Sequence, residues 1–112
     1  MPPIQKQLIE KRFENYCRTK IPIEIQDKVK LFYKMRGNSV TLIESRPVWN
    51  DPSRWTELFV AQVRYENETG IYTLFYANQN NKWFHYEFLD ATGDLDEVID
   101  AIENDSTGIF WG

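Results

Sequence analysis

Three side chains are the candidates for chemistry in this sequence, because they are among the few polar groups expected near apolar surroundings: Glu44, Arg46 and His85. Histidine changes charge near neutral pH, which suits it to proton transfer. Arginine can bind a carboxylate or a phosphate through its planar guanidinium group. With Asp51 as a further carboxylate, these residues define a hypothetical enzyme site of unknown reaction. The competing interpretation is structural: Glu44 and Arg46 form an ion pair at the rim of a sheet, and His85 packs among aromatic rings.

Tryptophans and arginines supply a second set of candidate residues, for binding. Trp49, Arg54 and Trp55 fall in the segment 47–55, which we expect to be a proline-stiffened loop that either packs on its own aromatic side chains or presents them to a ligand. We favour packing, because Trp most often contributes buried area. Arg36 and Arg64, with Arg46 and Arg54, lie in or beside predicted strands, as in single-stranded nucleic-acid platforms. A solvated sheet face is the simpler interpretation.

Composition limits the functions that the chain can have. It has 112 residues, a net charge of −4 and one cysteine, Cys17. The acidic balance disfavours nucleic acid as a partner, although a local positive patch remains compatible with it. A single cysteine and the lack of an apolar leader or span predict a cytoplasmic protein without a membrane partner. No Gly-rich phosphate loop, HExxH or CxxC motif occurs, so we expect neither cofactor nor metal.

These candidates must be positioned by helices and strands, which the apolar spacing predicts. Ile9, Phe13, Tyr16 and Cys17 recur at helical spacing between about residues 3 and 19. The period then changes to two, and Gly37-Asn38 separates two runs as a hairpin turn. Pairing Arg36 with Ser39 sets Met35 opposite Val40 and Tyr33 opposite Leu42, so that one face is apolar.

A second hairpin is predicted from Thr56 to about Ala77 around the turn 67–70. Pairing Glu66 with Ile71 sets Tyr65 opposite Tyr72 and Val63 opposite Leu74. A fifth strand, 82–88, follows a two-residue turn at Asn80-Asn81, which sets His85 beside Tyr76. A helix begins after the N-cap Asp94, with Leu95, Val98, Ile99 and Ile102 at helical spacing. We therefore expect one α+β domain over residues 1–112: an N-terminal helix, a five-stranded antiparallel β-meander and a C-terminal helix, with the apolar tail 109–112 docked on the core.

Several segments together resemble a known bacterial family. They are RGNSVTL at 36–42, Arg46-Pro47, Trp55-Thr56-Glu57, Arg64-Tyr65, Thr69-Gly70 and TGIFWG at 107–112. In this order they resemble the family filed as domain of unknown function 3024. The resemblance covers nearly the whole chain and is weakest before Ile21. It implies a bacterial protein, and it implies no activity, substrate or catalytic residue.

Three hypotheses for function follow. The first is a small non-enzymatic binding protein, since five aromatic side chains are predicted on the sheet face opposite the apolar set: Phe32, Phe75, Phe84, Tyr86 and Phe88. Such a face would bind a protein partner or a second copy of the chain. The second is an enzyme that uses Glu44, Arg46 and His85. The third is a protein that binds single-stranded nucleic acid through its arginines and aromatic rings.

Overall fold

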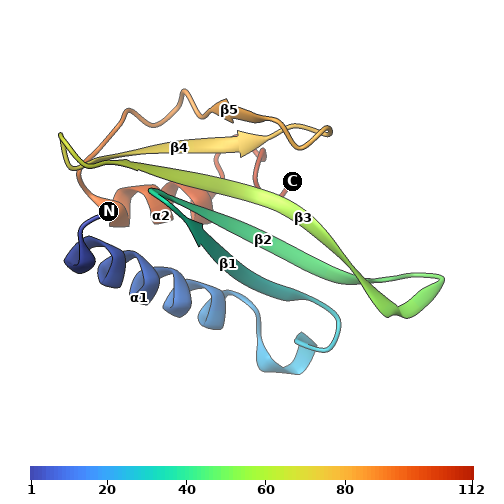
Figure 1. The fold of residues 1–112 in the computed structure, drawn as a ribbon. Coiled ribbons are helices and arrows are strands. Elements are labelled where there is room, and N and C mark those ends of the chain that lie inside the picture. Colours follow the sequence, from blue (N-terminus) through green and yellow to red (C-terminus); the bar gives the residue numbers. More distant parts are fainter.

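A computed structural model describes all of residues 1–112 as two helices that flank a five-stranded antiparallel sheet (Figure 1). The elements in chain order are α1 (Pro3–Lys20), the short 3₁₀ helix η1 (Ile23–Ile25), β1 (Lys30–Arg36), β2 (Ser39–Val48), β3 (Asp51–Glu66), β4 (Ile71–Ala77), β5 (Trp83–His85) and α2 (Leu95–Asn104). The α+β class and the element order are those predicted from the sequence.

The sheet is a meander in which each strand pairs with its neighbours in the chain, in the order β1-β2-β3-β4-β5. At the first turn Gly37 has a φ of +58°, the conformation that favours glycine. Arg36 pairs with Ser39 and Tyr33 with Leu42, which confirms the predicted register. The register of the second hairpin is also confirmed, with Glu66 opposite Ile71 and Val63 opposite Leu74.

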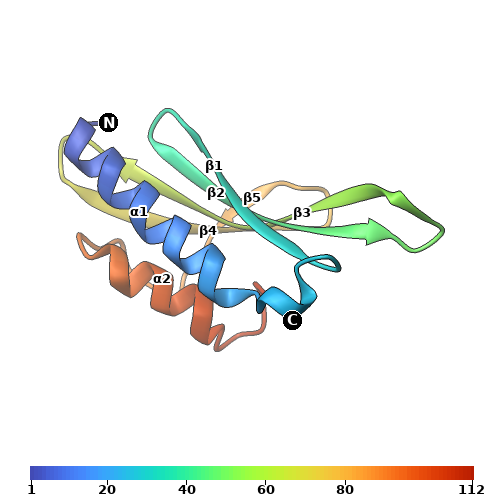
Figure 2. The ribbon, with the colours of Figure 1, turned by 90° about the horizontal axis from the view of Figure 1, so that it is seen from below.

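The prediction of a loop at 47–55 is wrong. β2 continues to Val48 and β3 begins at Asp51, so these residues extend the β2–β3 hairpin into a long two-stranded arm. The register shifts after Leu42, where Val60 is an extra residue on β3, and such a bulge bends the sheet and increases its twist. Figure 2 shows the arm projecting beyond both helices. At its tip Trp49 is 91% exposed, so the packing favoured for this residue is also wrong.

The fifth strand is shorter than predicted and differs in register by one residue. It spans Trp83–His85, and His85 pairs with Phe75 instead of Tyr76. The turn has three residues because Asn78 N–H donates to Lys82 O (2.9 Å) and Asn81 adopts a left-handed φ of +60°. Since side chains alternate along a strand, His85 lies on the face of Phe75. Phe84 and Tyr86 lie on the other face, contrary to the prediction.

Both helices pack on one face of the sheet and bury it (Figures 1 and 2). The core on this face includes Phe13 of α1, Leu42, Val63 and Leu74 of the sheet, and Ile102 of α2. Tyr33 packs against it, as the alternation predicts.

The C-terminal tail also packs on the chain's own core, as predicted: Phe110 is buried and the Trp111 indole N–H donates to Ile102 O (3.0 Å). Asp105, in a left-handed conformation after α2, holds the tail because its carboxylate accepts hydrogen bonds from the N–H groups of Phe110 (3.0 Å) and Trp111 (2.8 Å).

Polar contacts join the two helices. The Tyr16 hydroxyl donates to Glu103 (3.1 Å), and Lys20 forms an ion pair with the same carboxylate (2.6 Å). Burial and the Glu103 carboxylate both raise the pKa of Tyr16. Neither α1 nor α2 is both long and apolar enough to cross a membrane.

Candidate functional site

The face of the sheet opposite the helices is uncovered and carries a cluster of rings. We call it the open face. Its rings come from four strands, because alternate residues share a face: Phe32, Phe59, Phe75, Trp83 and His85. Of these only Phe32 and Phe75 were predicted for this face. Phe59 and Trp83 were missed, since they depend on the bulge at Val60 and on the turn at Asn81.

The rings pack against one another across the strands. Phe59 and Trp83 stack with centroids 5.6 Å apart and planes 15° from parallel. Phe75 and His85 lie tilted at 5.9 Å. Ile43 lies among them and is 1% exposed, although no helix covers this face. The open face is therefore an apolar layer whose rings are themselves the surface.

Positively charged groups lie over several of these rings. The Arg64 guanidinium carbon is 3.8 Å from the centroid of Phe75, and Lys34 Nζ is 5.8 Å from that of Phe32. Lys30 Nζ lies 4.2 Å from the Trp55 ring, on the arm. Such cation–π contacts hold cations close to the sheet without neutralising their charge.

The charge of the open face differs in sign from that of the whole chain. Lys30, Lys34, Arg36 and Arg64 outnumber its carboxylates, Glu57 and Glu66, of which Glu57 forms an ion pair with Lys34 (3.5 Å). The chain contains no lysine or arginine after Lys82, but eight aspartates and glutamates. Six of these eight lie in α2 or at its ends, on the other side of the sheet.

A shallow groove crosses the open face between β1 and β3. It has a volume of about 350 Å³, and its lining includes Lys34, Arg36, Thr41, Ile43 and Phe59. A volume of this size could hold one planar ring system. Its lining combines the apolar Ile43 and Phe59 with two cations and with the carboxylate of Glu57, which pairs with Lys34.

The three candidate catalytic residues are not brought together. Arg46 Nε donates to Glu44 (2.8 Å), and this pair lies on the helix-side face of β2, where Arg46 is 63% exposed. The hydrogen bond to Glu44 raises the pKa of Arg46. His85 lies on the open face and on β5, three strands away. Asp51 lies near the arm's tip, where it accepts from the Ser53 hydroxyl (2.6 Å).

Comparison with known proteins places the chain in a family. A family model described as a domain of unknown function (DUF3024) matches residues 1–112, the whole chain. The chain belongs to this family. No curated protein and no solved structure matches it.

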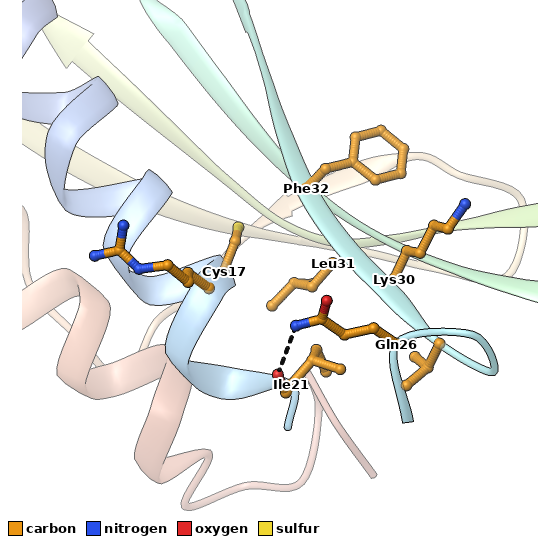
Figure 3. A pocket seen from close by; sticks show the side chains of 8 residues that line it. Cys17, Ile21, Gln26, Lys30, Leu31 and Phe32 are labelled. Carbon is orange, nitrogen blue, oxygen red and sulfur yellow. Dashed lines mark hydrogen bonds between the residues drawn. The ribbon is translucent and has the colours of Figure 1, made fainter. Parts of the chain in front are cut away.

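This DUF3024 chain has a second concavity, between the end of α1 and β1 (Figure 3). It has a volume of about 410 Å³ and an apolar wall that includes Cys17, Ile21, Val29 and Leu31. Gln26 lies at its side and donates to Ile21 O (3.3 Å). Burial raises the pKa of the Cys17 thiol to about 11, so the thiol stays protonated at neutral pH. No group of three His, Cys, Asp or Glu side chains in this DUF3024 member is arranged to hold a metal ion.

Proposed function

We propose that this protein is a non-enzymatic binding protein and that its open face binds single-stranded nucleic acid. The observation that carries the proposal is the combination of rings and cations on one uncovered sheet face. Proteins bind single strands by stacking bases on aromatic side chains and arginine planes, while cations contact the phosphates. Phe75 beneath Arg64 offers a guanidinium plane for stacking, and Lys30, Lys34 and Arg36 offer charge.

The net charge of −4 opposes a polyanion less than it first suggests. Most of the acidic excess lies at α2, with the sheet between it and the open face. Because salt screens exposed charges over about 8 Å at physiological ionic strength, a strand on the open face would interact mainly with the cations beside it. We further place the protein in the reducing cytoplasm, since Cys17 has no possible partner in the chain.

Fluorescence anisotropy of a labelled oligothymidine of about twelve nucleotides tests the proposal. We expect binding at low salt, with a plot of log K against log salt whose slope is roughly −2 to −3 for three or four phosphate contacts. Arg64→Ala should weaken binding, whereas Arg54→Ala, an exposed arginine of the arm, should leave it unchanged. No binding at low salt, or equal losses in the two variants, would overturn the proposal.

A protein partner or a second copy of the chain competes for the same face, because an apolar ring layer also suits a protein interface. Light scattering of the full chain distinguishes this alternative. We expect a monomer across the micromolar range. A dimer that Phe59→Asp dissociates, together with no affinity for oligothymidine, would assign the open face to protein contact instead.

A further inference from the structure

A second feature of the sheet is the outer edge of β1. β1 is an edge strand with no neighbour beyond it. Tyr65 N–H donates to Asn38 O (2.8 Å), so Asn38, Val40 and Leu42 direct their main-chain groups toward β3. The alternate residues Ser39, Thr41 and Ile43 therefore bond to Arg36, Lys34 and Phe32 of β1.

The remaining β1 residues point the other way. By the same alternation the main-chain N–H and C=O groups of Leu31, Tyr33 and Met35 are directed away from β2 and out of the sheet. No hydrogen bond from a turn, a loop or a side chain reaches them. The outer edge of β1 can accept another extended strand, as sheet edges do in peptide recognition.

A mainly apolar pocket, whose rim also includes Arg18, Gln26 and Lys30, lies next to this edge. The 410 Å³ concavity shown in Figure 3 includes Leu31, whose main chain belongs to the edge, and Cys17 and Ile21 from the end of α1. A strand added to β1 would alternate its side chains between the two faces of the sheet. Its side chains on the helix side would lie beside Leu31, which lines this pocket, and beside Tyr33 and Met35, and would therefore be apolar.

The charges of β1 indicate which side chains the incoming strand should carry on the open face. Lys30, Lys34 and Arg36 all lie on the open face of β1. Two β1 strands paired in the antiparallel direction would place six cations together on one face, and like charges on paired strands are unfavourable. An antiparallel contact with a second copy of the chain is thus disfavoured at this edge. Acidic side chains on the incoming strand complement the three cations.

From these features we infer that the edge of β1 binds an extended peptide in which acidic and apolar side chains alternate. The peptide adds a sixth strand to the sheet, its acidic residues lie beside Lys30, Lys34 and Arg36, and an apolar residue enters the pocket at Cys17 and Leu31. This inference shares Lys30, Lys34 and Arg36 with the nucleic-acid proposal, but it differs from that proposal in using the main-chain edge of β1 and the pocket between α1 and β1.

Amide hydrogen exchange of the full chain, resolved by NMR, tests the inference with the blocked peptide acetyl-Leu-Glu-Val-Glu-Leu-Glu-Val-amide. At a peptide concentration of about ten times Kd, the amides of Leu31, Tyr33 and Met35 should exchange about tenfold more slowly. Trp83 and His85 are the matched control, since their amides point outward at the opposite edge, on β5. Their exchange should not change.

Two variants and two peptides complete the design. The double variant K30E/K34E should bind the peptide about tenfold more weakly at low salt, because it reverses the charge at two exposed positions and the two losses of binding free energy add. The double variant K28E/K82E, which reverses two exposed lysines outside the strands, should bind within about twofold of the parent. A peptide with Lys in place of Glu, and one that groups its three Glu at one end, should not protect the β1 amides.

Four results would overturn the inference. They are no protection at millimolar peptide, equal protection of β1 and β5 amides, β1 amides already protected in a dimer without peptide, and the same protection produced by oligothymidine. Arg64→Ala separates the two proposals, because it should weaken oligothymidine binding and leave the peptide-induced protection unchanged.

Discussion

Cys17 shows how burial controls the chemistry of a single side chain. Its thiol is half-buried at the end of α1, and burial raises its pKa from an ordinary value of 9.0 to about 11. Because the thiolate is the nucleophile, this cysteine should be inert at neutral pH. Its position in the pocket wall is explained by packing alone.

The shifted pKa of Cys17 makes stability depend on alkaline pH. The folded chain holds the thiol proton more tightly than the unfolded chain, so the free energy of unfolding should fall as the pH rises from about 9 to 11. Tyr16, Tyr33 and Tyr72, whose pKa values burial also raises, act in the same direction. Urea denaturation of the parent and of Cys17→Ala measures the cysteine's share. A decline equally steep in both would show that Cys17 contributes nothing.

Asp105 is a residue whose role no sequence pattern indicated. Its carboxylate accepts two main-chain N–H bonds from the tail. Asp105→Ala leaves both donors unpaired and places Ala in a left-handed conformation, so it should lower the free energy of unfolding by about 1–3 kcal/mol. Thermal denaturation compares it with Asp90→Ala, an exposed aspartate. If both changes cost the same, the tail is not held by this carboxylate.

Contacts between residues close in the sequence could be predicted from the sequence alone. The positions of side chains that depend on distant parts of the fold could not. Glu44 and Arg46 were expected to form an ion pair, and they lie 2.8 Å apart, because residues i and i+2 of one strand share a face. The face of His85 was predicted wrongly, because it depends on a turn four residues earlier. The exposure of Trp49 depends on how far the helices extend beneath the sheet.

The turn between β4 and β5 determines which side of the sheet the last rings occupy. Asn78-Gln79-Asn80-Asn81 can form a loop of two or three residues, and nothing in its composition separates the two. The structure selects three, since the Asn78 side chain accepts from the N–H groups of Asn80 and Lys82 (2.9 Å each). A one-residue difference in loop length exchanges the two faces of β5.

Asn81 should tolerate glycine and resist a branched residue. At its φ of +60°, Asn81→Gly should be neutral or slightly stabilising, whereas Asn81→Val should cost about 1–2 kcal/mol because the Val side chain clashes in a left-handed conformation. Chemical denaturation of the two variants measures the difference. Equal stabilities would mean that the turn has another conformation.

At the scale of the whole molecule, the fold depends on one apolar face shared by α1, α2 and four strands. Phe13 is fully buried in it, and its ring centroid lies 6.1 Å from that of Tyr33. Phe13→Ala should therefore cost about 3–5 kcal/mol, a large part of the stability of a small protein. Trp49→Ala, the matched control on the arm, should change stability by less than about 0.5 kcal/mol. Differential scanning calorimetry measures the stability of both variants. Similar losses of stability in the two would mean that the arm is part of the core.

Alternation of apolar residues was sufficient to predict most of this architecture. Both hairpin registers followed from placing Tyr33, Leu42, Val63 and Leu74 on one face, because a slip of one residue would expose them all. The same patterns did not show that both helices would cover one face. They therefore did not define the open face as a surface, although they identified Phe32 and Phe75 as members of it.

The division of charge between the two sides of the sheet gives the molecule a permanent electric dipole moment. α1 contains five cations and two carboxylates, whereas α2 and its caps contain six carboxylates and no cation, so the helical layer is net negative and the open face net positive. The electric field of a nearby polyanion therefore exerts a torque on the protein before the two molecules come into contact. The protein would then approach the polyanion with its open face toward it. The association rate would exceed the rate expected from the net charge.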